Sequence, residues 1–299
     1  MPIQDLRVDI EKASKDEDFK ARKSILSKLL QGEWASYYKG RGIEFAGFRA
    51  YTSADDASLI DWKASLRSKD TLIREFEELK TYNVVFVLDV SDSMLFTSRE
   101  KLKVEYAAEL TYHFADAVIQ AGDGVGLAMV NNKIQEKVMP TMGQSVLDDF
   151  KFALLNGNNY GGNFDMGKAV SLTRGMLDDN SIVVIISDFF GMGAGWEKYV
   201  YMMRQDFQVL GVMLRDPRDL ELPKHGGQFL LQDPYSNDKI YVDSNDYKDK
   251  YAKLAGERDK YIRNVFINSK GDLCKIRTDE DFMKQLVDFF KYKVRSREH

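Results

Sequence analysis

The chain has 299 residues and one cysteine, with 44% apolar and 30% charged residues and a formal net charge of −4 at pH 7. This composition predicts a globular chain with a buried core. The absence of a basic excess argues against a general nucleic-acid binder. A single cysteine excludes internal disulfides and thiolate metal clusters. There is neither a signal peptide nor an apolar run of the ~18–20 residues that a membrane helix needs, so we expect a cytoplasmic protein without a membrane span.

Residues 1–80 are expected to form an N-terminal region of helix, structured loop and strand. Apolar residues at three- and four-residue spacing predict an amphipathic helix over 16–30, and Gly32 is expected to end it. A structured loop followed by a short helical segment is predicted over 40–65, and a strand over 71–79. The short connection to the next strand would suit an antiparallel neighbour, which would fuse this region to the edge of the main sheet.

From Asn83 onward, strands and helices alternate, which is typical of an α/β fold with a doubly wound, mostly parallel sheet. The predicted strands are 84–88, 125–130, 133–139 (an edge strand closed by Pro140), 181–187, 207–214 and 273–276. The predicted helices are 99–121, 146–155, 165–176, 196–204, 246–266 and 279–292. A small β-hairpin insertion at 228–242 interrupts the alternation. We expect this domain to cover residues 81–293 and a charged, frayed tail to follow at 294–299.

Two of the buried strands end in carboxylates, Asp89 and Asp188, and Ser91 and Ser93 follow the first of them. Open α/β sheets place their sites at this edge, and hydroxyl and carboxylate oxygens suit a hard cation such as Mg²⁺. Two carboxylates ~5 Å apart repel by roughly 3 kcal/mol at an effective dielectric constant near 20. A divalent cation would relieve this repulsion, and the alternative is one carboxylate with a raised pKa.

The segment from Asp89 to Ser93 resembles the metal-ion-dependent adhesion site of von Willebrand factor A domains, whose signature is Asp-x-Ser-x-Ser. The resemblance implies that the two serine hydroxyls bind the metal directly, that the carboxylates act largely through water, and that a third loop supplies a Thr. Here that loop contains Gly161, Gly162 and Asn163, so an amide oxygen stands in the Thr position, where it can still bind Mg²⁺, Mn²⁺ or Ca²⁺. The predicted metal ligands are Asp89, Ser91, Ser93, Asn163 and Asp188. Taken singly, the serines and aspartates could instead cap helices.

The segment ahead of this domain carries a second resemblance. Its motifs are Gly40-Arg-Gly-Ile-Glu-Phe45, Arg49-x-Tyr51, Asp55-Asp56 and Ile60-Asp-Trp-Lys-Ala-Ser65. They are similar to the signature of the bacterial and archaeal DUF58 family, in which it precedes a von Willebrand factor A-like domain. Ser53-Ala54 stands where Pro-Gly is usual. The signature could form a buried ion-pair network or a docking surface, and its tryptophan, Trp62, could anchor the fold or face a partner.

Members of this family are typically paired with MoxR-type AAA+ ATPases, so the resemblance implies an adaptor or co-chaperone in complex assembly or metalloenzyme maturation. We therefore expect a non-enzymatic, metal-dependent module whose protein partner donates a carboxylate to the cation. One alternative is a metal-dependent phosphohydrolase, but Ser91 occupies the place where such an enzyme needs its acid, no lysine motif is evident, and no histidine is near. The other alternative is a metal-free structural interaction protein.

Overall fold

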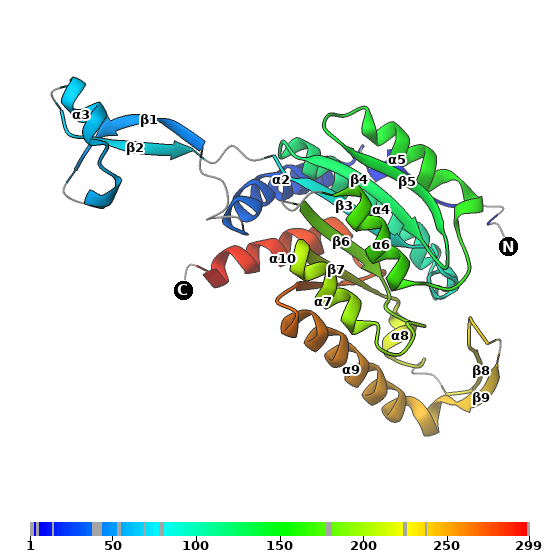
Figure 1. The fold of residues 1–299 in the computed structure, drawn as a ribbon. Helices are drawn as coiled ribbons and strands as arrows, with labels where there is room; N and C mark the ends of the chain where they lie inside the picture. The colour runs from blue at the N-terminus through cyan, green and yellow to red at the C-terminus, as the bar shows by residue number, and fades with distance from the viewer. Residues whose placement is uncertain are drawn as a thin grey trace. The chain divides into compact units, whose positions relative to one another are not determined.

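The computed structural model describes residues 3, 6–13, 15–37, 44–52, 55–68, 70–77, 81–177, 181–223, 226–236 and 238–297 (Figure 1). The chain forms two compact units, a large one of residues 1–31 and 82–299 and a small one of residues 32–81. The N-terminal region that the sequence indicated over 1–80 is therefore divided between them, because its first 31 residues belong to the large unit.

The large unit is built on a six-stranded sheet in the order β10–β7–β6–β3–β4–β5 (Figure 1). The strands are β3 (Asn83–Asp89), β4 (Gly124–Val130), β5 (Ile134–Thr141), β6 (Ser181–Ser187), β7 (Gln208–Arg215) and β10 (Asp272–Arg277). All neighbours are parallel except β4 and β5, which are antiparallel. Every residue of β4 and β6 is buried, as expected for parallel strands covered on both faces. The predicted α/β class, with a doubly wound and mostly parallel sheet, is confirmed.

Helices cover both faces of this sheet. They are α1 (Ile10–Ala13), α2 (Glu17–Tyr37), α4 (Lys103–Gln120), α5 (Val146–Leu155), α6 (Met166–Met176), α7 (Glu197–Asp206), α8 (Pro217–Leu220), α9 (Ser244–Asn268) and α10 (Phe282–Arg297). Successive side chains of a strand point to opposite faces. Val85 and Val87 of β3 accordingly join one core with α6, α7 and α9, whereas Phe86 packs its ring against Phe114 of α4 and Phe150 of α5.

The small unit pairs β1 (Glu44–Ala50) with β2 (Leu72–Glu77) in an antiparallel ribbon that also carries a short 3₁₀ turn, η1 (Ala57–Leu59), and helix α3 (Trp62–Ser68). The expectation that β2 extends the main sheet is wrong, because β2 pairs with β1. Strand β1 lies in the segment 40–65, for which a loop was predicted. Asp61 begins α3 by accepting hydrogen bonds from two backbone N–H groups. Trp62 is 67% exposed, so it does not anchor the fold as a buried side chain would.

Arg49 and Asp55 of the signature form a bidentate ion pair with N–O distances of 2.7 and 2.8 Å. It is a half-exposed pair on the surface of the small unit, not part of a buried ionic network. Most of the Gly40–Phe45 motif, the Ser53-Ala54 turn and the Trp34 side chain lie outside the described residues.

Several predicted boundaries differ from the structure; the helix predicted from Arg99, for example, begins at Lys103. Helix α2 continues through Gly32 to Tyr37, and β5 continues through Pro140, where an irregular register at the sheet edge tolerates the missing N–H. The predicted frayed tail at 294–299 is helical as far as Arg297, because α10 extends that far.

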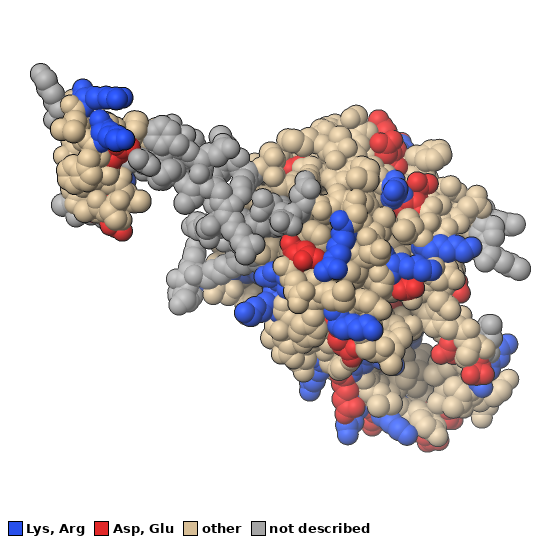
Figure 2. Space-filling model, viewed as in Figure 1, with Lys and Arg blue, Asp and Glu red and all other residues tan. Residues whose placement is uncertain are grey.

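The predicted insertion is a hairpin of β8 (Gln228–Gln232) and β9 (Lys239–Asp243). No helix in the described part of the chain is long and apolar enough to cross a membrane. On the face of the large unit seen in Figure 2, basic and acidic side chains are interspersed, without the continuous basic surface that marks a nucleic-acid binder.

Candidate functional site

The candidate site lies where the parallel neighbours β3 and β6 end. Asp89 is the last residue of β3, Asp188 follows β6, and both carboxylates are completely buried. Ser91 and Ser93 lie on the loop after β3, which turns into the short 3₁₀ segment η2 (Asp92–Leu95). The Ser93 hydroxyl donates to Asp188 Oδ1 at 3.0 Å, and the Ser91 Oγ lies 3.4 Å from Ser93 Oγ. Four of the five predicted ligands therefore share one hydrogen-bonded cluster.

Asp89 has hydrogen-bond donors but no cationic partner among the described residues. Its Oδ1 accepts from the Ser91 N–H at 2.9 Å, and its Oδ2 accepts from the Ser187 hydroxyl at 2.6 Å. Burial, reinforced by the nearby charge of Asp188, raises the pKa of Asp89 to about 7. The protein supplies no cation to balance the ionised form of this carboxyl group, so that form is disfavoured and a bound proton or cation would relieve the cost.

Asp188 meets the opposite electrostatic environment. The Lys103 ammonium, only 1% exposed, donates to Asp188 Oδ2 at 2.6 Å and also lies 3.1 Å from Asp219. Arg215 adds a hydrogen bond of 2.5 Å to the backbone carbonyl of Asp188. Burial is the largest single influence and would raise the pKa of Asp188, but the charge and hydrogen bond of Lys103, the Phe190 N–H and the charge of Arg215 together hold that pKa below its ordinary value.

The third loop is held against the first through its backbone. The Asp92 N–H donates to the Gly162 carbonyl at 2.7 Å, and the Gly162 N–H returns a bond to Asp92 Oδ1 at 2.8 Å. Gly162 has a φ of +90°, a conformation that side chains resist. Asn163 is exposed, and no described hydrogen bond joins its side chain to the four clustered residues. The backbone of the third loop thus lies close to the site, but its predicted ligand, Asn163, is exposed.

The sequence did not predict several residues that contact the site, among them Ser187, Arg215, Lys103 and Tyr235. Lys103 comes from the start of α4, 85 residues before Asp188, and nothing in its local sequence separates it from a solvated helix lysine. Tyr235 comes from the turn of the β8–β9 hairpin, and its hydroxyl lies 3.2 Å from Ser91 Oγ. Its ring lies so close to Gly191 that an added Cβ there would stand 2.0 Å from a ring carbon. Only a long-range contact pattern would have revealed Lys103 or Tyr235.

These residues fit a hard divalent cation held weakly. The oxygens of Ser91, Ser93 and Asp89 are the donors that Mg²⁺ prefers, and a cation would balance the charge of Asp89. Lys103 already balances Asp188, which lowers the negative charge available to a metal. Among the described residues, no group of three or more His, Cys, Asp or Glu side chains forms a closed metal cage. A bound ion would therefore depend on the serine hydroxyls as well as the carboxylates, and would keep several coordination positions for water or a partner.

The chain is similar in sequence to curated relatives and, more distantly, in structure to solved proteins. An uncharacterized protein of Mycobacterium tuberculosis (strain H37Rv) is 26% identical over 276 residues, which cover 89% of this chain and 84% of the relative. The structure of the conserved hypothetical protein BatB from Bacteroides thetaiotaomicron is 15% identical and covers 72% of this chain and 99% of its own, with a TM-score of 0.44. A von Willebrand factor type A structure from Catenulispora acidiphila is 11% identical, and the match covers 74% of this chain and 43% of that structure, with a TM-score of 0.40.

Structural likenesses at these TM-scores are too distant to transfer a function. A family-level match is closer: the model of the protein of unknown function DUF58 matches residues 47–261, which is well over half of the chain. That span begins within β1 of the small unit and includes both strand ends of the candidate site, the third loop and the hairpin. The chain belongs to the DUF58 family.

Proposed function

We propose that the rim formed by the ends of β3 and β6 is a cation-assisted protein-binding site and that the protein is a non-enzymatic adaptor. The observation that carries this proposal is the buried Asp89 carboxylate, which lies beside two serine hydroxyls without a cation of its own. A protein that buries an unbalanced charge weakens its own fold. Such a charge is retained where a ligand will balance it, so the site suits a bound cation and then a partner.

The residues that would hold Mg²⁺, or Mn²⁺ or Ca²⁺, are Ser91, Ser93 and Asp89, with Asp188 beside them and Asn163 from the third loop. When bound, such an ion supplies a Lewis acid that accepts a carboxylate from a partner protein. Contacts within the protein already orient these side chains. Lys103 fixes Asp188, which in turn accepts the Ser93 hydroxyl and thereby orients that side chain.

For the partner, we propose a MoxR-type AAA+ ATPase, with the adaptor acting in the cytoplasm in protein complex assembly or metalloenzyme maturation. The support is the family membership, together with the DUF58 signature ahead of the domain that carries the site. An adaptor of this kind needs a stable scaffold more than a catalytic base, and the buried strands supply that scaffold. The clustered side chains are themselves buried, so a partner would have to displace contacts such as that between Tyr235 and Ser91 to reach them.

The direct test is the effect of Mg²⁺, Mn²⁺ and Ca²⁺ on urea unfolding of the full chain. A cation concentration about 100-fold above its Kd should raise the free energy of unfolding by about 2.7 kcal/mol. Ser91→Ala should abolish this gain, whereas Ser171→Ala, on the exposed surface of α6, should keep it. If none of the three ions stabilises the wild-type protein, the cation-assisted site is excluded and a metal-free interaction role takes its place.

The phosphohydrolase alternative is tested separately. Lys103 is the lysine that contacts the cluster, but its ammonium bonds Asp188 and Asp219, and no described contact joins it to Asp89. We therefore expect phosphatase and ATPase assays with Mg²⁺ or Mn²⁺ to show no turnover. Turnover that disappears in Asp89→Ala would establish an enzyme instead.

A further inference from the structure

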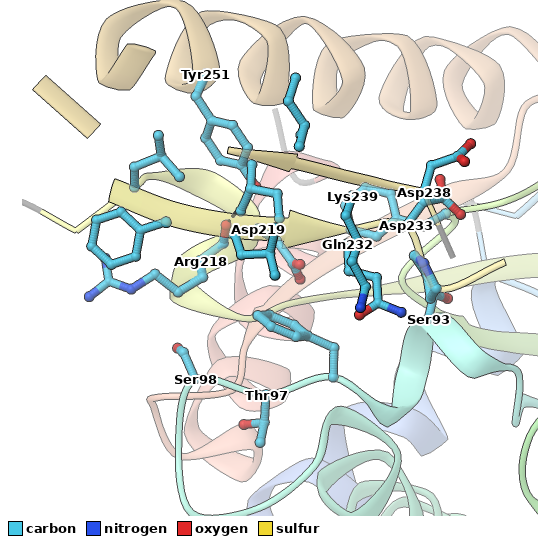
Figure 3. Close-up of a pocket in the computed structure, with 18 of the residues that line it drawn as sticks. Ser93, Thr97, Ser98, Arg218, Asp219, Gln232, Asp233, Asp238, Lys239 and Tyr251 are labelled. Carbon is cyan, nitrogen blue, oxygen red and sulfur yellow. Dashed lines mark hydrogen bonds between the residues drawn. The ribbon is translucent and has the colours of Figure 1, made fainter. Parts of the chain in front are cut away.

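A cavity of about 910 Å³ lies beside the candidate site, between the β8–β9 hairpin and the end of the sheet (Figure 3). Its walls come from the segment after η2, the segment after β6, helix α8, the hairpin and helix α9. Ser93 and Tyr235 belong to its lining, so the cavity is continuous with the cluster at the strand ends. Its volume is within the ~300–1,000 Å³ range of ligand pockets.

Two arginines and Lys239 of the hairpin line this cavity without an ion pair to a described carboxylate. Arg218 of α8 and Arg258 of α9 both line it, and neither forms an ion pair with a described carboxylate. The Arg258 guanidinium lies 4.9 Å from the centroid of the Phe190 ring, a cation–π contact that keeps it over the cavity wall. Lys103 also reaches the cavity, but Asp188 and Asp219 take up its charge. The arginines therefore remain available to a carboxylate ligand, which the planar guanidinium binds in a bidentate manner.

The opposite end of the cavity carries both signs of charge. Figure 3 shows Arg218 near Tyr251 on one side, and Asp233, Asp238 and Lys239 on the other. Asp233 accepts hydrogen bonds from two backbone N–H groups of the hairpin turn, which fixes its carboxylate there. A bound acidic segment would therefore meet attraction at the Arg218 end, whereas at the other end Lys239 offsets part of the repulsion from the two aspartates.

The cavity also presents apolar side chains that the fold leaves uncovered. Phe96 is 45% exposed, and Leu230 and Ile240 of the hairpin are 46% and 62% exposed. These three residues line the same cavity as the two arginines. Protein interfaces commonly bury a few large apolar or aromatic anchors next to arginines. The combination fits a peptide that carries a large apolar residue near an acidic one.

We propose that this cavity binds an extended acidic segment of a partner protein, with a carboxylate on Arg218 and Arg258 and an apolar side chain between Phe96 and Leu230. The proposal rests on the proposed function, because it names the chemistry of the partner that also reaches Ser91 and Ser93. Under this proposal, the β8–β9 hairpin selects the partner, whereas the site at the strand ends binds the cation.

The test is selection of a random-peptide display library on the full chain in Mg²⁺, followed by fluorescence-polarisation measurements of Kd on the enriched peptides. We expect enrichment of Asp or Glu close to Phe, Leu or Trp. Arg258→Ala should weaken binding about tenfold, the effect of one well-placed charged contact. Arg263→Ala, on an exposed position of the same helix, should leave Kd unchanged. Phe96→Ala should also weaken binding, whereas Phe152→Ala on α5 should not.

Arg258, Phe96 and their controls are exposed, so these variants are expected to fold, and circular dichroism checks this. Enrichment of basic peptides, failure to enrich any peptide, or binding that is insensitive to both Arg258→Ala and Phe96→Ala would overturn the proposal. Binding that is lost with chelator and in Ser91→Ala but kept in the cavity variants would also overturn it, while leaving the proposed function intact. Binding lost only in the cavity variants and indifferent to chelator would support the cavity and contradict the cation-assisted site.

Discussion

The two sides of the rim occupy equivalent places in the fold and yet have opposite electrostatics. Asp89 ends β3 and Asp188 follows the adjacent parallel strand β6, and both carboxylates are completely buried. Only Asp188 has a lysine, and the pKa of Asp188 lies below its ordinary value whereas that of Asp89 rises to about 7. Position in the sheet therefore does not decide the charge state of a carboxylate; the side chains that reach it from elsewhere do. The Asp188 side therefore has its charge balanced within the protein, and under the proposed function the Asp89 side is the one that a cation would balance.

Loss of the lysine should have the largest effect. Lys103→Met leaves Asp188 and Asp219 buried without their shared cation, so the free energy of unfolding should fall by about 3–5 kcal/mol. The matched control, Lys253→Met, removes a lysine that is 76% exposed and should change stability by less than about 0.5 kcal/mol. Urea unfolding of both variants measures the difference. Equal, small losses would show that the Asp188 side is not the structural half of the rim.

Removal of the balanced carboxylate should come next. Asp188→Asn takes away the closest partner of Lys103 and weakens the bond from Ser93, but Lys103 keeps Asp219. We expect a loss of about 2–4 kcal/mol in urea unfolding, smaller than the loss for Lys103→Met. A gain in stability would contradict the assignment of Asp188 to the structural side.

The unbalanced carboxylate should behave in the opposite way. The pKa of Asp89 is about 7 in the folded state and near 3.8 when unfolded, so between these values the folded state binds more protons. Its contribution therefore makes the protein less stable as pH rises from about 4 to 7, and the cost is complete above pH 7. In chelator at pH 8, Asp89→Asn should be more stable than wild type by about 1–3 kcal/mol.

This gain should shrink toward zero as the pH is lowered to about 3, where the wild-type carboxyl is protonated in both states. Unfolding curves at several pH values test the slope as well as the sign. A variant that is less stable than wild type at pH 8 would mean that the Asp89 charge is balanced inside the protein after all.

The third loop should show the smallest effect on stability. Asn163 is exposed, so Asn163→Ala should change the free energy of unfolding by less than about 0.5 kcal/mol in chelator. If its amide oxygen reaches a bound cation, as the sequence predicts, the stabilisation by Mg²⁺ should be reduced in this variant. An unreduced Mg²⁺ effect would remove Asn163 from the ligand set and leave the serines and aspartates.

Local patterns were enough to predict the strands that carry the site. The apolar run before Asp89 and the one before Asp188 each predict a buried strand, and both strands are present. Pattern was less useful at the ends of elements: α2 passes through Gly32 and β5 through Pro140. Strand β1 was missed, because the predicted loop gave no alternating apolar pattern and its pairing with β2 is a tertiary choice.

By itself, the sequence determined the α/β class and the short cluster of Asp89, Ser91 and Ser93, because helix and strand periodicities and a five-residue motif are local properties of the chain. Only the tertiary structure decided which charges are balanced and what covers the site. Lys103 meets Asp188 across 85 residues and Tyr235 meets Ser91 across 144 residues. Such contacts depend on how helices and a hairpin pack at the end of the sheet, and no spacing within the sequence encodes that packing.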